Sequence, residues 1–160
     1  MIFSCTPWRL KGVKWRCIGR GKDIDAARAE SHRLGINAEF CESVPNTEMP
    51  RYYRQAHVFV LSSRYEGHPK ALLEAMACGC ACVVTRAPGN LDDVTDEMTA
   101  LVVDLSSDAL YEALVRLRDD GALRQRLGAA AAAYVAERYN LARIAQAELA
   151  VYREALARGC

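Results

Sequence analysis

The sequence predicts an α/β fold in which helices cover both faces of a parallel sheet. Short apolar runs alternate with longer stretches of helical periodicity, which is the pattern of repeated βαβ units. The stretch 57–84 holds one such unit in full, as strand, loop, helix and strand. At 160 residues the chain has the length of one domain that can bury a core.

In the first half of the chain, turn-forming residues separate the predicted elements. Asp23 or Asp25 is placed to cap a helix, and Gly35 is the residue type expected just after its last turn. Pro50 fits the first turn of a second helix. The elements expected here are a strand at 14–18, a helix up to residue 34, a strand at 37–41, a helix from Met49 and a strand at 57–61.

The strand at 57–61 is rich in apolar residues, so we expect it to be buried on both faces. A polar loop at 62–68 follows, and Pro69 stands where the first residue of a helix is expected. Good helix formers fill 71–77, and Gly79 ends that helix before an apolar strand at 81–84. These two strands are therefore expected to be parallel neighbours.

The second half of the chain is predicted to hold one more strand and three helices. Residues 99–103 form a short apolar run, and Asp104 and the segment from Ser106 to Asp108 are placed to cap the helix after it. Leucines at helical spacing mark its buried face, and an Ala-rich stretch favours the next helix. The helices expected are one with Leu110, Leu114 and Leu117 facing the core, one at 121–138 and one at about 141–158.

A binding site is expected around Gly67, because ligands of such sheets bind beyond the carboxyl ends of the strands. The first backbone N–H groups of the following helix have no partners within the helix and attract an anion such as phosphate. Two carboxylates, Glu66 and Glu74, flank this point with seven residues between them. Carboxylates accept hydrogen bonds from vicinal hydroxyls, so the pattern predicts a phosphate between two polyol groups, as in a nucleotide sugar.

The run from Ser62 to Gly79, with its Glu66-x7-Glu74 pair, resembles the C-terminal half of family 4 retaining glycosyltransferases, also called glycosyl transferases group 1. These enzymes have two Rossmann-like domains in the GT-B architecture and bind a nucleotide-sugar donor mainly through the second. The resemblance implies that residues 1–160 form one Rossmann-like α/β/α domain, half of a GT-B fold. It places the acceptor site in an N-terminal domain that these residues do not include.

The resemblance also implies roles for individual residues. Glu66 would position the hydroxyls of the donor sugar and is the residue assigned to catalysis, while Glu74 would hold the ribose. Backbone groups near His68 would bind the diphosphate, and the loop 86–90 would lie near the sugar. The predicted substrate-binding set is Glu66, Gly67, His68, Lys70, Ala71, Glu74, Gly89 and Asn90. No metal or cofactor is implied beyond the nucleoside-diphosphate sugar.

The chain departs from the family pattern at three places. The Arg and Lys that bind the diphosphate from a loop before the first strand have no clear match, and Lys11 is a weak candidate. The Gly of the loop near the base is replaced in Glu42-Ser43-Val44. Asn90 stands where the pattern has a second Gly.

The final helix packs on the N-terminal domain in the family, so an exposed apolar stripe on it would favour self-association.

Composition excludes several classes of protein. A net charge of +1 gives no reason to expect a nucleic-acid partner. No apolar run reaches the length of a membrane span and no signal peptide is evident, so we expect a cytoplasmic protein, with a membrane-surface acceptor and a peripheral position at the inner membrane left open. The odd count of seven cysteines favours reduced thiols, and Cys78-x-Cys80-x-Cys82 lacks the nearby His that would favour a metal site.

Two other functions stay open from the sequence. The chain fits a non-enzymatic nucleotide-sugar-binding module that works with a companion chain. It also fits a structural domain in which Glu66 and Glu74 are only surface residues.

Overall fold

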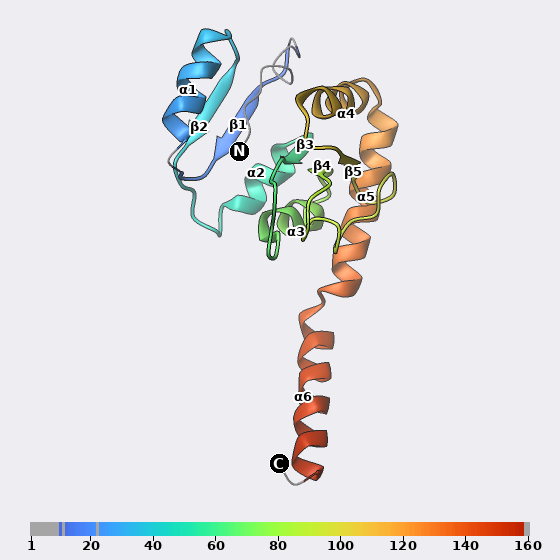
Figure 1. The fold of residues 1–160 in the computed structure, drawn as a ribbon. Coiled ribbons are helices and arrows are strands. Elements are labelled where there is room, and N and C mark those ends of the chain that lie inside the picture. The colour runs from blue at the N-terminus through green and yellow to red at the C-terminus, as the bar shows by residue number, and fades with distance from the viewer. Residues whose placement is uncertain (1–9, 11, 22, 159–160) are drawn as a thin grey trace.

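A computed structural model describes residues 10, 12–21 and 23–158 and shows the expected alternation of strands and helices (Figure 1). Lys11, the weak diphosphate candidate, lies outside the described residues, as do Cys5 and Cys160. The elements are β1 (Trp15–Ile18), α1 (Ile24–Arg33), β2 (Ala38–Cys41), α2 (Met49–Gln55), β3 (Val58–Leu61), α3 (Lys70–Ala77), β4 (Ala81–Thr85), β5 (Leu101–Val103), α4 (Ser107–Asp119), α5 (Gly121–Arg138) and α6 (Leu141–Ala157).

The strands form two parallel sheets, where the sequence predicted one. β1 pairs with β2, and β3 pairs with β4, which pairs with β5. Within the described residues no strand hydrogen-bonds to the second edge of either β1 or β3, so these edges divide the sheet. β3 is consequently an edge strand, and the expectation that it is buried on both faces is wrong, since all four of its residues are only half-buried.

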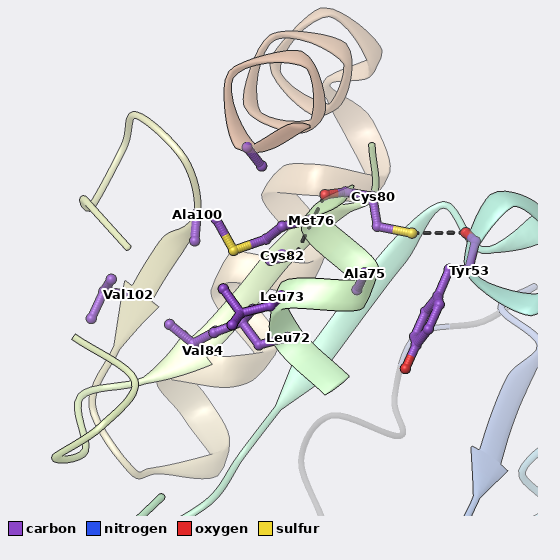
Figure 2. Packing of buried hydrophobic residues seen from close by; sticks show 11 residues of the cluster. Tyr53, Leu72, Leu73, Ala75, Met76, Cys80, Cys82, Val84, Ala100 and Val102 are labelled. Atoms are coloured by element: carbon purple, nitrogen blue, oxygen red, sulfur yellow. Dashed lines mark hydrogen bonds between the residues drawn. The ribbon is translucent and has the colours of Figure 1, made fainter. Parts of the chain in front are cut away.

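β4 is the centre of the core, and its side chains alternate between two apolar layers. Cys82 and Val84 pack with Leu72 and Met76 of α3 on one face (Figure 2). The neighbouring residues Ala81 and Val83 pack on the other face, against α4 and the start of α5; that layer includes Leu110, Leu114, Leu117, Leu123 and Leu127. The predicted three-layer α/β/α order is confirmed around this strand.

Turn residues end and begin the helices as the sequence predicts. Gly35 and Gly79 follow α1 and α3 with left-handed φ angles of 64° and 77°, which glycine adopts without strain. The Ser106 side chain accepts a hydrogen bond from the Ala109 N–H at the start of α4. Asp23 is the N-cap of α1, although its side chain accepts no capping bond.

The last helix, α6, extends away from the rest of the chain (Figure 1). None of its residues is buried, and its apolar side chains, such as Leu149 and Tyr152, are 51% and 65% exposed. The apolar stripe expected on this helix is therefore uncovered. Within the described residues, no helix combines the length and the apolar character needed to cross a bilayer.

The described cysteines are free thiols, and two of them serve packing. The buried thiols of Cys80 and Cys82 donate to the backbone carbonyls of Tyr53 and of Cys80. Burial raises the pKa of the Cys80 thiol to about 11, so it stays protonated at neutral pH. In the part of the chain that the structure describes, no group of His, Cys, Asp and Glu is arranged to hold a metal ion.

Truncation of Leu72 tests the core around β4. Its side chain is fully buried, so we expect Leu72→Ala to lower the free energy of unfolding by about 2–5 kcal/mol through lost burial and a cavity. Leu141→Ala is the matched control, because Leu141 is 83% exposed and should cost under about 0.5 kcal/mol. Urea denaturation measures both, and equal losses would show that this cluster is not the centre of stability.

Candidate functional site

A pocket of about 510 Å³ lies where the carboxyl ends of β1 and β2 face the start of α3. Its volume lies within the range of small-molecule sites. The chain turns at the pocket after both β1 and β2. The Gly19 N–H donates to the Cys41 carbonyl and joins the ends of these two strands. The lining residues are Ile18, Gly19, Arg20, Glu42, Ser43, Val44, Asn46, Met49, Tyr53, Lys70, Ala71 and Glu74.

The start of α3 and the loop before it hold unpaired backbone donors beside this pocket. The helix begins at Lys70, one residue later than predicted, with Pro69 as its N-cap. Among the described residues, no hydrogen bond is formed by the backbone N–H groups of Gly67, His68 and Ala71. The Lys70 N–H is different, because it donates to the His68 carbonyl at 2.8 Å. Ala71 lines the pocket, so an anion there would meet its unpaired N–H and the positive end of the helix dipole, and Gly67 and His68 hold further unpaired N–H groups on the preceding loop.

Glu74 lies on the second turn of α3 and lines the pocket. Its side chain is 36% exposed and has two partners: Oε1 is 3.7 Å from the Lys70 ammonium, and Oε2 accepts a 3.1 Å hydrogen bond from the Tyr53 hydroxyl. A carboxylate offers about four acceptor positions. Glu74 therefore keeps acceptor positions for hydroxyl groups of a ligand.

Glu66 lies outside the lining of this pocket, on the loop before α3, with Gly67 and His68. The Glu66 N–H donates to the Pro88 carbonyl at 3.0 Å, which docks the loop on the turn after β4. Gly89 has a φ of 85°, and a Cβ added there would be 2.0 Å from the Glu66 carbonyl oxygen. Gly89 is thus needed for the close approach of the two loops, a reason for glycine that the sequence did not reveal.

Asn90 is fully buried beneath these two loops. Its amide donates to the Thr85 carbonyl at 3.0 Å and to the Ser63 hydroxyl at 3.3 Å. The structure therefore gives Asn90 a role in joining the loops, and its predicted contact with a donor sugar stays a prediction.

His68 is exposed beside the same loop, with its ring centre 6.2 Å from that of Tyr139. The Tyr139 hydroxyl donates to the buried carboxylate of Asp93, and Arg138 lies 4.0 Å from the same carboxylate. This network joins the end of α5 to the segment after Asn90. The hydrogen bond from the Tyr139 hydroxyl to Asp93 raises the pKa of Tyr139, so the phenol remains a donor at neutral pH.

The sequence did not single out two residues that line the pocket. The ring of Tyr53 is buried, as is usual for an aromatic residue on the inner side of a helix, but its hydroxyl faces Glu74. Arg20 lies in the turn after β1, and its guanidinium is 3.4 Å from the Ser43 hydroxyl in the pocket lining. The loop at 42–44 lines the pocket although it lacks the family's Gly. The pocket unites Lys70, Ala71 and Glu74 of the predicted set.

Comparison with known proteins decides the family. The family model described as "Glycosyl transferases group 1" matches residues 11–134, which include β1 to β5 and most of α5. The chain belongs to this family. Among curated relatives of this group 1 glycosyltransferase chain, D-inositol 3-phosphate glycosyltransferase of Acidothermus cellulolyticus is 33% identical over 141 residues, which are 86% of this chain and 31% of the relative. The chain thus spans about a third of that relative's length.

Solved structures agree on the fold. Sucrose-phosphate synthase from Thermosynechococcus elongatus has a TM-score of 0.81 and 26% identity over 90% of this chain and 39% of its own. Anabaena HepE in complex with UDP-glucose has a TM-score of 0.82 and 18% identity over 90% of this chain and 42% of its own. This group 1 glycosyltransferase chain therefore has the Rossmann-like α/β architecture of half a GT-B enzyme.

Proposed function

We propose that this chain binds a nucleoside-diphosphate sugar as the donor half of a retaining glycosyltransferase. The observation that carries the proposal is the cluster of unpaired N–H groups at the start of α3, between two carboxylates. The family match supports it, as do related folds whose structures contain UDP and UDP-glucose. The donor is the substrate, and the proposal includes no metal or cofactor.

We propose that the donor extends from the pocket, past the start of α3, to the loops that hold Glu66 and Gly89. The base lies between Arg20 and Val44, and Glu74 accepts hydrogen bonds from the ribose hydroxyls. The diphosphate binds at the unpaired N–H groups of Gly67, His68 and Ala71, with the mobile charge of Lys70 beside it. The sugar lies toward Gly89, where Glu66 binds its hydroxyls and serves as the catalytic residue.

The chemical work of the site is to stabilise the leaving group. Breaking the bond between the sugar and the diphosphate leaves negative charge on the phosphate oxygens. Preorganised N–H dipoles and a cation favour that charge in the transition state more than in the ground state. Glu66 keeps the sugar in place through this change. Under this proposal Glu74 contributes to donor binding, whereas Glu66 is the residue on which turnover depends most.

The acceptor site belongs to another part of the working enzyme. The chain spans only part of its relatives, so we propose that an N-terminal acceptor domain or a companion chain completes it. The 160 residues alone would then bind donor and transfer little sugar, as a partner-dependent module would. The free thiols fit a reducing compartment, and we place the reaction in the cytoplasm, on a soluble or membrane-surface acceptor.

Replacement of Glu74 tests the donor site. We expect one of UDP, GDP and ADP, measured by calorimetry with and without a sugar, to bind the wild type. Glu74→Ala should weaken that binding about 10- to 100-fold, because it removes hydrogen bonds to a charged acceptor. Glu112→Ala, an exposed carboxylate on α4, should bind as the wild type does. Absence of binding to the wild type at millimolar nucleotide would refute the proposed function.

A further inference from the structure

Glu74 has one exposed and one buried partner. The Lys70 side chain, 3.7 Å from Oε1, is 71% exposed, and a surface pair of this kind holds a carboxylate only weakly. The Tyr53 hydroxyl, 3.1 Å from Oε2, comes from a residue that is only 5% exposed. A diphosphate would compete for Lys70. The buried tyrosine is then the partner that Glu74 retains when the site is occupied.

Tyr53 is itself held by contacts with the core. Its ring packs edge to face against Phe59, with 5.8 Å between the ring centres. Its backbone carbonyl accepts a 2.8 Å hydrogen bond from the Cys80 thiol, and Figure 2 shows this contact at the side of the core cluster. The hydroxyl therefore projects from a fixed ring, and its position is set by the core at the joint between α2, β3 and β4.

The phenol of Tyr53 stays protonated and can therefore always donate a hydrogen bond to Glu74. Burial, and next the nearby Glu74 carboxylate, raise the pKa of the Tyr53 phenol well above its ordinary value. The phenol therefore remains protonated throughout the physiological range. Among the described residues, Glu74 is the acceptor of its proton.

We infer that Tyr53 is a positioning residue that fixes the Glu74 carboxylate in the orientation that receives the ribose hydroxyls. This inference rests on the proposed donor site. A glutamate side chain loses much rotamer freedom when it is held in place, and a hydrogen bond to a rigid ring removes that cost before the ligand binds. Lys70 can then turn from Glu74 toward the diphosphate, because Tyr53 keeps Glu74 oriented when Lys70 leaves.

The test compares Tyr53→Phe with the wild type for the nucleoside diphosphate that binds among UDP, GDP and ADP, and for its 2′,3′-dideoxy counterpart. Phe keeps the ring packing, so the melting temperature should change little. We expect binding of the normal nucleotide to weaken about 3- to 10-fold, since the released Glu74 side chain must lose its rotamer freedom when the ligand binds. Binding of the dideoxy nucleotide should be unchanged, because it has no ribose hydroxyl for Glu74 to receive.

A second comparison separates positioning from direct contact. In a Glu74→Ala background, the additional Tyr53→Phe change should cause no further loss of affinity. A further loss, or equal weakening for both nucleotides, would show that Tyr53 acts on the ligand or on the fold and would overturn the inference. Unchanged binding by Tyr53→Phe, with a loss in Glu74→Ala, would overturn the inference and leave the donor site standing. Failure of every nucleotide to bind the wild type would overturn both.

Discussion

Gly89→Ala should weaken nucleotide-sugar binding about tenfold or more, although residue 89 belongs to neither α3 nor the pocket lining. The new Cβ would lie 2.0 Å from the carbonyl oxygen and 2.7 Å from the carbonyl carbon of Glu66, so one of the two loops must shift. A shift of about 1 Å at a catalytic group is enough to cost about 100-fold in rate. We expect affinity for the donor to fall by about tenfold or more, as measured by calorimetry.

A glycine with a similar positive φ and no close neighbour provides the control. Gly35 has a φ of 64°, and a Cβ added there meets nothing within 4 Å. Gly35→Ala should cost about 1–2 kcal/mol from left-handed backbone strain alone and should leave donor binding intact. Gly89→Ala should lose more stability than this, because it adds the clash to the strain. Wild-type donor affinity in Gly89→Ala would contradict the close docking of the two loops.

Gly128→Ala should destabilise the fold, which reverses the usual effect of this substitution. In the middle of a helix, replacing Gly by Ala ordinarily stabilises by about 1 kcal/mol. Here a Cβ would lie 2.2 Å from the carbonyl oxygen of Gly79, which is backbone and has little room to move. We expect the free energy of unfolding to fall by about 1–3 kcal/mol, because α5 must move away from the turn between α3 and β4.

Gly121 at the start of the same helix gives the matched comparison. A Cβ there would be 3.4 Å from the end of the Arg124 side chain, which is flexible. Gly121→Ala should therefore be neutral or slightly stabilising in urea denaturation. If Gly128→Ala behaves as Gly121→Ala does, the close contact between α5 and Gly79 is not a feature of the folded protein in solution.

Local pattern was enough to predict most elements within one or two residues. The βαβ unit follows from an apolar run, a loop ended by Pro69, good helix formers and Gly79, and each of these acts on its own neighbours in the chain. The same local reasoning placed the unpaired N–H groups at the start of α3. It was wrong by one residue about where the helix begins, and therefore about the Lys70 N–H, because a capping bond depends on backbone angles that sequence does not specify.

Relations between distant segments were decided by the tertiary structure. The division of the sheet at β1 and β3, and the resulting half-burial of Val58–Leu61, depend on which strand edges find partners. An apolar run looks the same at the edge of a sheet as at its centre. The uncovered stripe on α6 has the same origin, since helical periodicity identifies an apolar face and does not say what covers it.

In the candidate site, too, local sequence pattern predicted some features and tertiary packing produced the others. Local sequence pattern identified the family, the Glu66-x7-Glu74 pair and, to within one residue, the helix start between those carboxylates. Only the tertiary structure brought the Tyr53 hydroxyl to Glu74 and Gly89 to the Glu66 backbone. These contacts join residues more than twenty positions apart, and their existence depends on how α2, α3 and the two loops pack, which no local spacing records.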